Sequence, residues 1–262
     1  MEESFPSSAE RFVWGMSLLK ACSMRFRWNE ENKNRDNFLS ELLKENKNPD
    51  GSEKEICAVE LIHSKKVISV KNAGDCKNLR CDGIVTDNPS LIPVVTVADC
   101  MPVFICEPKT KVFGVLHSGW KGTGIIKEAL DLCRKTYGTK NEDFFVVLGP
   151  HIRNCCYNVD KERAEYFKNN FTPDCISEIQ NPVDKNFPYA LSMEKANLAV
   201  LKECGVPSSH ITLNGECTSC TKLNDGFKYG SNRRETALLP AGLSAEEKSR
   251  LFTVQCAFVI RK

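Results

Sequence analysis

Three side chains that can bind a metal ion occupy similar places along the sequence. His63 ends the apolar segment ICAVELIH, Cys100 follows VVTVAD, and His117 ends VFGVLH, in a chain with only four histidines. Each therefore lies where a strand-like segment gives way to a loop, and functional groups collect at such ends. Two imidazoles and one thiolate suit zinc and leave its fourth position open. The alternative is that both histidines are ordinary residues satisfied by hydrogen bonds near the core.

The segment HSGWKGTGIIKEAL places small and basic residues before a predicted helix. Free backbone N–H groups and the helix dipole favour an anion at such a position. We therefore expect it to supply the substrate-binding residues Gly119, Trp120, Lys121, Gly122 and Thr123. The alternative for the glycines is a tight turn that needs them for its backbone angles alone. The alternative for the tryptophan is packing.

Two adjacent arginines, Arg233 and Arg234, follow the segment YGSN. The planar guanidinium group suits bidentate binding of phosphate, so both are candidate substrate-binding residues. Adjacent residues of a strand point to opposite faces, so on a strand only one of them would enter the site. A solvated pair of charges is the alternative.

Asp99 precedes the cysteine of the predicted metal site and is a candidate for orienting a ligand or transferring protons. It could equally cap a turn. Cys217 and Cys220 form a CTSC pair, and Cys76 and Cys81 form a looser pair. These spacings do not match a zinc ribbon, so a separate four-cysteine zinc site is not expected.

The spacing of apolar residues predicts strands mixed with helices. Phe38, Leu39, Leu42 and Leu43 form one apolar face of a helix over 35–46. Further helices are predicted at 122–138, 161–170 and 192–205, and strands at 56–63, 66–70, 92–99, 103–107, 112–117, 144–149 and 251–260. This order is typical of an α+β fold, here a single layered domain over residues 1–262 with mixed β-sheets flanked by helices.

Composition restricts the partners of the chain. Its 262 residues are 41% hydrophobic and 27% charged, as in ordinary globular proteins. A net charge of +2 gives no strong positive field, so we expect a small-molecule partner and no nucleic acid. The start is acidic where a signal peptide is basic, and no apolar run reaches about 18 residues. We therefore expect a cytoplasmic protein without a membrane span, either a monomer or a homodimer. Its 14 cysteines are scattered along the chain, and we expect most of them to be reduced thiols.

Three segments carry a resemblance to a known family: VADCMPVFICEP, VFGVLHSGWKGTGIIKEAL and VVLGPHIRNCCYNV. Together with LSMEKANLAVLKECGVPSSHI, GECTSC and YGSNRRE, they resemble the multicopper polyphenol oxidase or laccase-domain family. The same family is also called the purine nucleoside phosphorylase or peptidoglycan editing factor family. In it a zinc ion is bound by a histidine after an apolar strand, the cysteine of ADC and the histidine before GW. The resemblance therefore implies zinc at His63, Cys100 and His117.

The resemblance also implies an activity. Phosphate would attack the ribose C1′ of adenosine, inosine or methylthioadenosine in a zinc-dependent purine nucleoside phosphorylase that also deaminates adenosine. We expect Asp99, Cys100 and Lys121 to be catalytic. Alternatively, Cys100 could be a nucleophile activated by His117 or His63 in a hydrolase that edits peptidoglycan precursors. A copper phenol oxidase is less favoured, because its four coppers need about ten histidine ligands.

The start of the chain departs from the family pattern. The family generally opens with a strand that carries a TR-GG signature, and MEESFPSSAERFVWGMSLL has no such element. An arginine that contacts phosphate would then be missing, and Arg11 or a basic group elsewhere could replace it.

Overall fold

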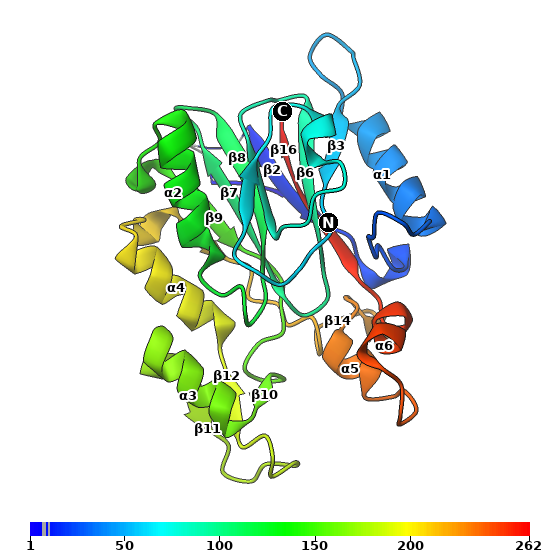
Figure 1. Cartoon of the computed structure of the whole chain (residues 1–262), viewed down its shortest axis with the longest axis vertical. Helices are drawn as coiled ribbons and strands as arrows, with labels where there is room; N and C mark the ends of the chain where they lie inside the picture. Colours follow the sequence, from blue (N-terminus) through cyan, green and yellow to red (C-terminus); the bar gives the residue numbers. More distant parts are fainter. Residues whose placement is uncertain (7–8, 10) are drawn as a thin grey trace.

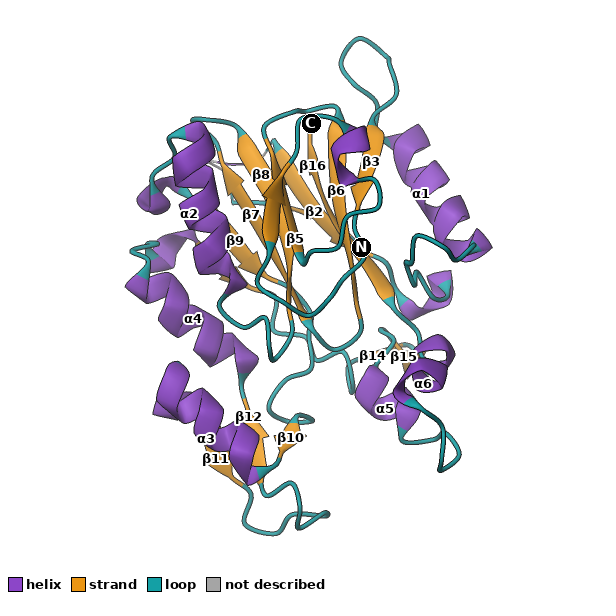
Figure 2. Ribbon diagram, viewed as in Figure 1, coloured by secondary structure: helices purple, strands orange, loops and turns teal. Residues whose placement is uncertain are grey.

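The polypeptide forms two β-sheets that pack face to face, with helices on both outer sides (Figures 1 and 2). The computed structural model describes residues 1–6, 9 and 11–262. Helices α2 (Ile125–Tyr137) and α4 (Met193–Glu203) cover one sheet, and α1 (Lys33–Glu45) covers the other. The layers therefore run helix, sheet, sheet, helix, which confirms the predicted α+β class.

Both sheets are mixed. The five-stranded sheet consists, in spatial order, of β1 (Glu2–Ser4), β2 (Phe12–Met16), β16 (Gln255–Arg261), β6 (Leu91–Val97) and β3 (Glu55–Ala58). The six-stranded sheet consists of β13 (Ile211–Leu213), β9 (Phe145–Leu148), β7 (Met101–Glu107), β8 (Val112–Ser118), β5 (Gly83–Thr86) and β4 (Val67–Ser69). The pairs β3 with β6, β4 with β5, and β9 with β13 are parallel.

Alternate side chains of β7 enter two different hydrophobic cores. Val103 and Ile105 pack with Leu130 of α2 on the outer face of the six-stranded sheet. Phe104 and Cys106 point the other way and pack between the two sheets. Because both faces of the strand are covered, its sequence is apolar on every side. A third core lies between the five-stranded sheet and α1.

Local signals in the sequence begin and end the helices. Asn32 caps α1, because its side chain accepts a hydrogen bond from the backbone N–H of Arg35. Helix α2 ends at Gly138, whose φ of 69° lies in the left-handed region that glycine adopts without strain. The helices predicted at 35–46, 122–138, 161–170 and 192–205 are confirmed as α1, α2, α3 (Lys161–Asn170) and α4.

Smaller elements flank one end of the central sheets, at the bottom of Figure 1. On one side, α3 contacts a three-stranded sheet in which β12 (Tyr189–Leu191) lies between β10 (Asn158–Val159) and β11 (Ile176–Glu178). On the other side are the strands β14 (Lys222–Leu223) and β15 (Gly226–Phe227) and the helices α5 (Asn232–Thr236) and α6 (Ala245–Leu251). Of these elements, α3 supplies Arg163 and α5 supplies Asn232, Arg233 and Thr236 to the pocket described below.

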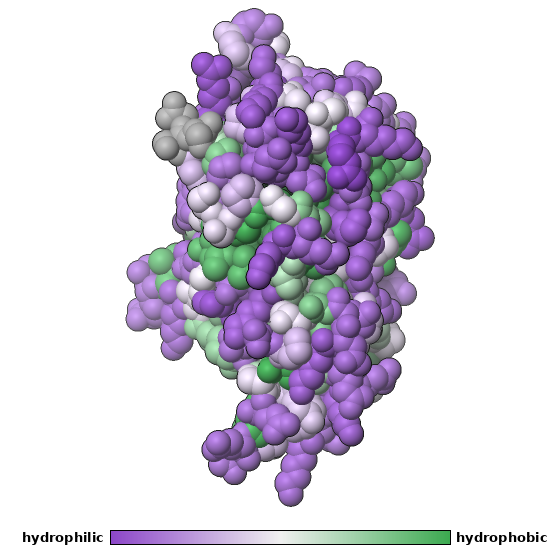
Figure 3. Space-filling model, turned by 90° about the vertical axis from the view of Figure 1, so that its left-hand side faces the viewer, coloured by the Kyte–Doolittle hydropathy of each residue, from purple (hydrophilic) through white to green (hydrophobic). Residues whose placement is uncertain are grey.

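The face of the molecule that carries α2, α3 and α4 is mostly hydrophilic, with a hydrophobic area near mid-height (Figure 3). Within the described residues, no helix is long and apolar enough to cross a lipid bilayer.

Two local predictions are wrong. The strand predicted at 56–63 ends at Ala58, because the chain leaves β6 and Glu60 instead forms an isolated bridge with Arg80. Arg233 and Arg234 lie in α5 rather than in a strand, because Ser231 caps a helical turn there. The start of the chain lacks the family signature but forms the buried strand β2. The single domain over 1–262 stays a prediction.

Candidate metal centre and pocket

The three predicted metal ligands lie together. The ligand atoms of His63, Cys100 and His117 are all within 4.8 Å of one another. His63 lies in the loop after β3, Cys100 lies directly before β7, and His117 lies near the end of β8. The two imidazole rings stand almost perpendicular, with centroids 5.0 Å apart. Elements of both large sheets thus bring two nitrogen donors and one sulfur donor to one point.

A buried carboxylate, Asp82, orients both histidines. Its Oδ1 accepts hydrogen bonds from the backbone N–H of His63 and from the Nδ1 side of His117, both at 2.9 Å. Its Oδ2 accepts from the backbone N–H and the hydroxyl of Ser64, both at 2.7 Å. The bond to Nδ1 leaves Nε2 of His117 free for a metal, which is how carboxylates commonly support zinc-binding histidines. Sequence analysis missed Asp82, which carries no signal beyond an acid inside the apolar segment CDGIV.

The two imidazoles differ in proton affinity. Burial and the neighbouring His117 lower the pKa of His63. Burial also disfavours the charged form of His117, but Cys100 and Asp82 outweigh it and raise the pKa of His117 to about 9. A metal ion bound here would compete with protons for the same donors, so its binding would release protons.

Gly119 provides the space that these donors share. A Cβ atom at this position would lie 2.9 Å from Sγ of Cys100 and 3.7 Å from Nε2 of His117. The sulfur and the nitrogen therefore face the same small volume. Two imidazoles and a thiolate around such a volume fit a zinc ion with an open coordination position.

The turn between β8 and α2 favours the packing alternative for its small residues. A Cβ atom on Gly122 would meet the carbonyl oxygen of Ser64 at 2.8 Å. Thr123 is buried, and its hydroxyl donates to the carbonyl of Gly119 at 3.0 Å, which closes the turn. Helix α2 itself begins at Ile125. The substrate contacts predicted for Gly119, Gly122 and Thr123 stay predictions.

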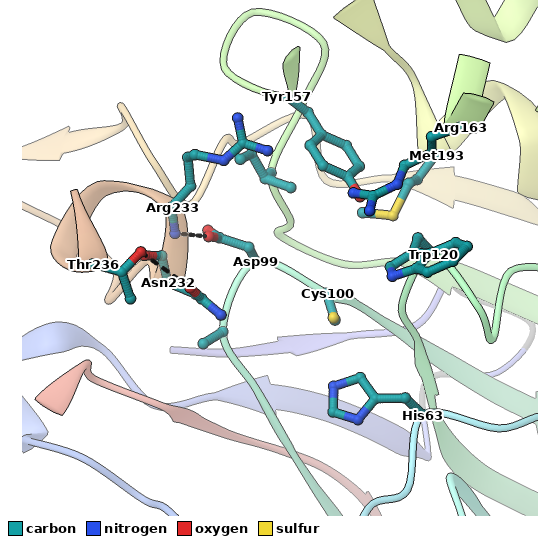
Figure 4. A pocket seen from close by; sticks show the side chains of 12 residues that line it. His63, Asp99, Cys100, Trp120, Tyr157, Arg163, Met193, Asn232, Arg233 and Thr236 are labelled. Atoms are coloured by element: carbon teal, nitrogen blue, oxygen red, sulfur yellow. Dashed lines mark hydrogen bonds between the residues drawn. The ribbon is translucent and has the colours of Figure 1, made fainter. Parts of the chain in front are cut away.

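A pocket of about 300 Å³ opens beside the three metal ligands (Figure 4). Its lining combines apolar and cationic side chains, with His63, Asp99, Cys100, Trp120, Tyr157, Arg163, Met193, Asn232, Arg233 and Thr236 labelled in the figure. The guanidinium group of Arg163 lies 4.6 Å from the centre of the Trp120 ring, and one of its nitrogens donates to the Tyr157 hydroxyl at 3.4 Å. Lys121 is exposed, with its Nζ 5.3 Å from the centre of the same ring.

Arg163 and Tyr157 were missed as site residues. Arg163 lies in the confirmed helix α3, but nothing in KERAEYF marks it as facing a pocket. Tyr157 lies in the segment VVLGPHIRNCCYNV, which carries the family resemblance but does not mark this residue as facing a pocket. Their roles depend on the return of α3 and β10 toward the end of the central sheets, which the sequence does not reveal.

Asp99 holds helix α5 in place. It is buried and has a φ of 71°, a left-handed conformation that is uncommon for residues other than glycine. Its carboxylate accepts hydrogen bonds from the hydroxyls of Thr218 at 2.7 Å and Ser231 at 3.0 Å, and from the backbone N–H of Arg233 at 2.7 Å. Burial raises the pKa of Asp99, although these donors favour its ionised form. The contacts favour the capping interpretation over proton transfer.

The two arginines of α5 point in different directions. Arg233 lines the pocket and donates twice to the carbonyl of Asn158, at 3.1 Å each. Arg234 donates instead to the carbonyls of Thr218, Ser219 and Tyr229, at 2.7 to 3.1 Å. Its guanidinium group therefore holds three loop residues, and the substrate contact predicted for Arg234 stays a prediction.

A second cavity, of about 90 Å³, lies on the other side of the metal ligands. It shares His63 and Cys100 with the first pocket and is also lined by Arg25 and Arg27. Arg25 is engaged by Glu30 and Ser249, whereas Arg27 makes a long hydrogen bond of 3.5 Å to a carbonyl. Arg11 lines a different cavity and does not replace an arginine at this site.

Four other cysteines also lie together. Sequence analysis considered Cys217 and Cys220 alongside Cys76 and Cys81, but the structure brings the CTSC pair to Cys155 and Cys156. The four sulfur atoms lie within 4.8 Å of one another and could hold a metal ion.

The sequence of the chain matches a known family over the region that contains both clusters. Residues 31–237 match the model described as multi-copper polyphenol oxidoreductase laccase. The chain belongs to this family. All the predicted metal ligands of the laccase-domain chain, and all the labelled residues of its pocket, fall inside the matched region.

Relatives of this laccase-domain protein carry names of enzymes that act on purine nucleosides. Purine nucleoside phosphorylase YlmD of Geobacillus stearothermophilus is 34% identical over 171 residues, which cover 64% of this chain and 61% of that protein. Adenosine deaminase RL5 of an unknown prokaryotic organism is 31% identical over 161 residues, covering 59% of this chain and 60% of that protein. The chain thus spans about three fifths of the length of these relatives.

The overall fold agrees with a solved structure. The crystal structure of YlmD from Geobacillus stearothermophilus matches with a TM-score of 0.73 and 23% sequence identity, covering 96% of this chain and 92% of that chain. The two chains therefore share a fold.

Proposed function

We propose that this protein is a zinc-dependent purine nucleoside phosphorylase that also deaminates adenosine. The observation that carries the proposal is the meeting of two imidazoles and one cysteine sulfur, within 4.8 Å of one another, beside a pocket lined by aromatic and arginine side chains. The names of two relatives support the choice of a purine nucleoside as substrate. The expected partners are thus a purine nucleoside and phosphate, in a cytoplasmic monomer or homodimer.

His63, Cys100 and His117 would hold the zinc ion. When bound, zinc would supply a Lewis acid that polarises oxygen groups and makes water more acidic. Asp82 keeps Nε2 of His117 directed at the shared volume through its bond to Nδ1. Gly119 leaves that volume free of side-chain atoms.

The pocket offers complementary contacts to each part of the substrate. Trp120 and Tyr157 present aromatic surface against which a purine ring can pack. Arg163 has no carboxylate partner among the described residues, so its guanidinium group is available to phosphate. Arg233 lies across the pocket, and Lys121 at its edge adds positive charge. A volume of about 300 Å³ lies at the lower end of the range for small-molecule sites.

The test is an assay of purified, zinc-loaded protein with adenosine, with and without phosphate, read by chromatography. We expect adenine and ribose 1-phosphate only when phosphate is present, and inosine without it. Cys100→Ala should abolish both products together with one bound zinc, whereas Cys22→Ala, an exposed cysteine elsewhere, should change neither. Absence of phosphate-dependent cleavage and of inosine in the zinc-loaded wild type would contradict the proposal.

A second candidate function follows from the spatial arrangement of Asp82, His117 and Cys100. The carboxylate of Asp82 orients the imidazole of His117, and this imidazole lies beside the thiol of Cys100. This is the arrangement of a cysteine hydrolase with a base and an orienting acid. Alkylation separates the two functions. A zinc-bound thiolate at Cys100 should resist iodoacetamide until a chelator is added, whereas a free nucleophile should react at once. A copper phenol oxidase stays disfavoured by the count of four histidines.

A further inference from the structure

Two loops that are distant in sequence place four cysteine thiols in one cluster. Cys155 and Cys156 lie between β9 and β10, and Cys217 and Cys220 lie between β13 and β14. A parallel bridge between His151 and Cys217 joins the loops, with the N–H of Thr218 donating to the carbonyl of His151 at 3.0 Å. The cluster is a second group of metal-binding atoms, separate from His63, Cys100 and His117.

The sulfur positions fit a tetrahedral metal ion. With zinc–sulfur bonds of about 2.3 Å, tetrahedral geometry places the sulfur atoms about 3.8 Å apart. The Sγ atoms of Cys155 and Cys220 are 3.7 Å apart, and the largest separation in the cluster is at most 4.8 Å. A disulfide would instead need about 2.05 Å between two sulfurs and would leave the other two without a role.

The backbone of the CTSC loop is folded around its first cysteine. The N–H groups of Cys220 and Thr221 donate to the carbonyl of Cys217, at 3.3 Å and 2.9 Å, and form a tight turn. Sγ of Cys217 accepts a hydrogen bond from the N–H of Arg153 at 3.4 Å, a contact that favours a thiolate. Cys217 is buried, whereas Cys155 and Cys220 are exposed, so an ion can reach the cluster from solvent.

We propose that Cys155, Cys156, Cys217 and Cys220 bind a second zinc ion, which has a structural role. Four protein ligands fill the coordination sphere and leave no position for substrate, as in structural zinc sites. Four thiols that bind one zinc ion give up their protons to solvent, so no oxidant or reductant takes part. This inference does not depend on the proposed function.

The second zinc ion would hold two walls of the pocket together. Cys156 directly precedes Tyr157, which lines the pocket. On the other loop, the hydroxyl of Thr218 donates to Asp99, and the carbonyls of Thr218 and Ser219 accept from Arg234 of α5. Through the first loop, the zinc ion would therefore fix Tyr157. Through the second loop and Asp99, it would fix helix α5, which carries Arg233.

Metal analysis of single-site and double-site variants tests the second zinc ion. Protein expressed with zinc and purified under reducing conditions should contain two zinc ions per chain in the wild type and in Cys22→Ser, the matched exposed control. Cys100→Ala and the double variant C155S/C220S should each contain one. The proposal is overturned if C155S/C220S retains the zinc content of the wild type. A zinc content that falls only in Cys100→Ala would support the metal centre of the proposed function and contradict the four-cysteine zinc site.

Alkylation of the wild type gives a second readout that does not depend on folding of a variant. Cys155 and Cys220 are exposed, as Cys22 is, and all three should react with iodoacetamide when no metal is bound. With zinc they should be protected, and a chelator should make them reactive. Equal reactivity of Cys155, Cys220 and Cys22 in the zinc-loaded protein would contradict the site. Protection that persists after chelation, with the mass of a disulfide, would also contradict it.

Discussion

At the scale of single residues, we expect the zinc affinity of the metal centre to depend on a side chain that is not itself a metal ligand. Asp82 contacts His63 through its backbone and His117 through its ring. We predict that Asp82→Asn lowers zinc affinity about 10-fold to 100-fold, because the amide is neutral and has one acceptor oxygen where the carboxylate serves both His117 and Ser64. Competition with a chromogenic chelator measures this affinity.

The control for Asp82 is Asp87→Asn, which removes an acid of the same segment that pairs with Lys71 near the surface. It should leave zinc affinity unchanged. Equal affinities of Asp82→Asn and the wild type would show that the orientation of His117 does not depend on the carboxylate.

His151 gives the stability of the protein a dependence on pH. Burial lowers its pKa to about 4, from an ordinary value of 6.5, while its Nδ1 side bonds to the carbonyl of Gly149 at 2.8 Å. Between these values the unfolded chain binds the proton and the folded chain does not, so stability falls as pH falls from 6.5 to 4. The difference corresponds to about 3 kcal/mol.

Urea unfolding of the wild type and His151→Gln at pH 4.5, 5.5 and 7 tests this dependence on His151. The variant should lose less stability than the wild type toward acid, because glutamine does not titrate. Parallel loss of stability in the two proteins would assign the acid sensitivity to other groups.

The sequence predicts the metal ligands but not the residues around them. The chain has only four histidines, and His63, Cys100 and His117 each follow an apolar segment and match the ligands of the resembled family, so they are recognisable without a structure. Asp82 and Arg163 belong to abundant residue types whose meaning comes from what the fold places beside them. Their roles therefore become visible only when β5 and α3 are placed next to β8 and the pocket.

At the scale of elements, the turn between β8 and α2 links backbone shape to the metal centre. We predict that Gly119→Ala reduces zinc binding by the protein, because its Cβ atom would lie 2.9 Å from Sγ of Cys100. The ligand sulfur or the turn must then shift. Zinc content per chain and the chelator competition both report the effect.

Gly74→Ala is the matched control, because nothing lies within 4 Å of a Cβ atom at that position. It should bind zinc like the wild type. Full zinc content in Gly119→Ala would mean that the turn moves without cost and that the glycine serves another purpose.

Helix boundaries could be predicted better than the short elements. Caps such as Asn32 and Gly138 act within a few residues, so α1 and α2 are evident from local sequence. Helix α5 has only five residues and was not predicted, because beyond its cap at Ser231 it is supported by the distant carboxylate of Asp99. Sequence patterns do not show such long-range support.

At the scale of the whole molecule, strand order is the part that the sequence leaves open. The strand at 251–260 was expected, but its neighbours were not. β16 lies between β2 and β6, so the last strand of the chain pairs with one near the start and one near residue 95. Apolar patterns identify strands without naming their partners.

This placement predicts the slowest hydrogen exchange in the chain. Ala257 and Phe258 are buried and pair with both β2 and β6, so their amide protons should exchange only when the whole molecule unfolds. Residues of α6, which is largely exposed, should exchange far sooner. Native-state exchange followed by mass spectrometry compares the two, and similar rates would contradict a cooperative core around β16.

The position of β16 also sets an order of events during synthesis. Strand β6 leads directly to Cys100, yet it lacks one neighbour until residues 255–261 have left the ribosome. The nascent chain therefore exposes an open sheet edge next to the thiol of Cys100 while residues 98–254 are being translated. We therefore expect acquisition of the ion at His63, Cys100 and His117 to follow the pairing of β6 with β16.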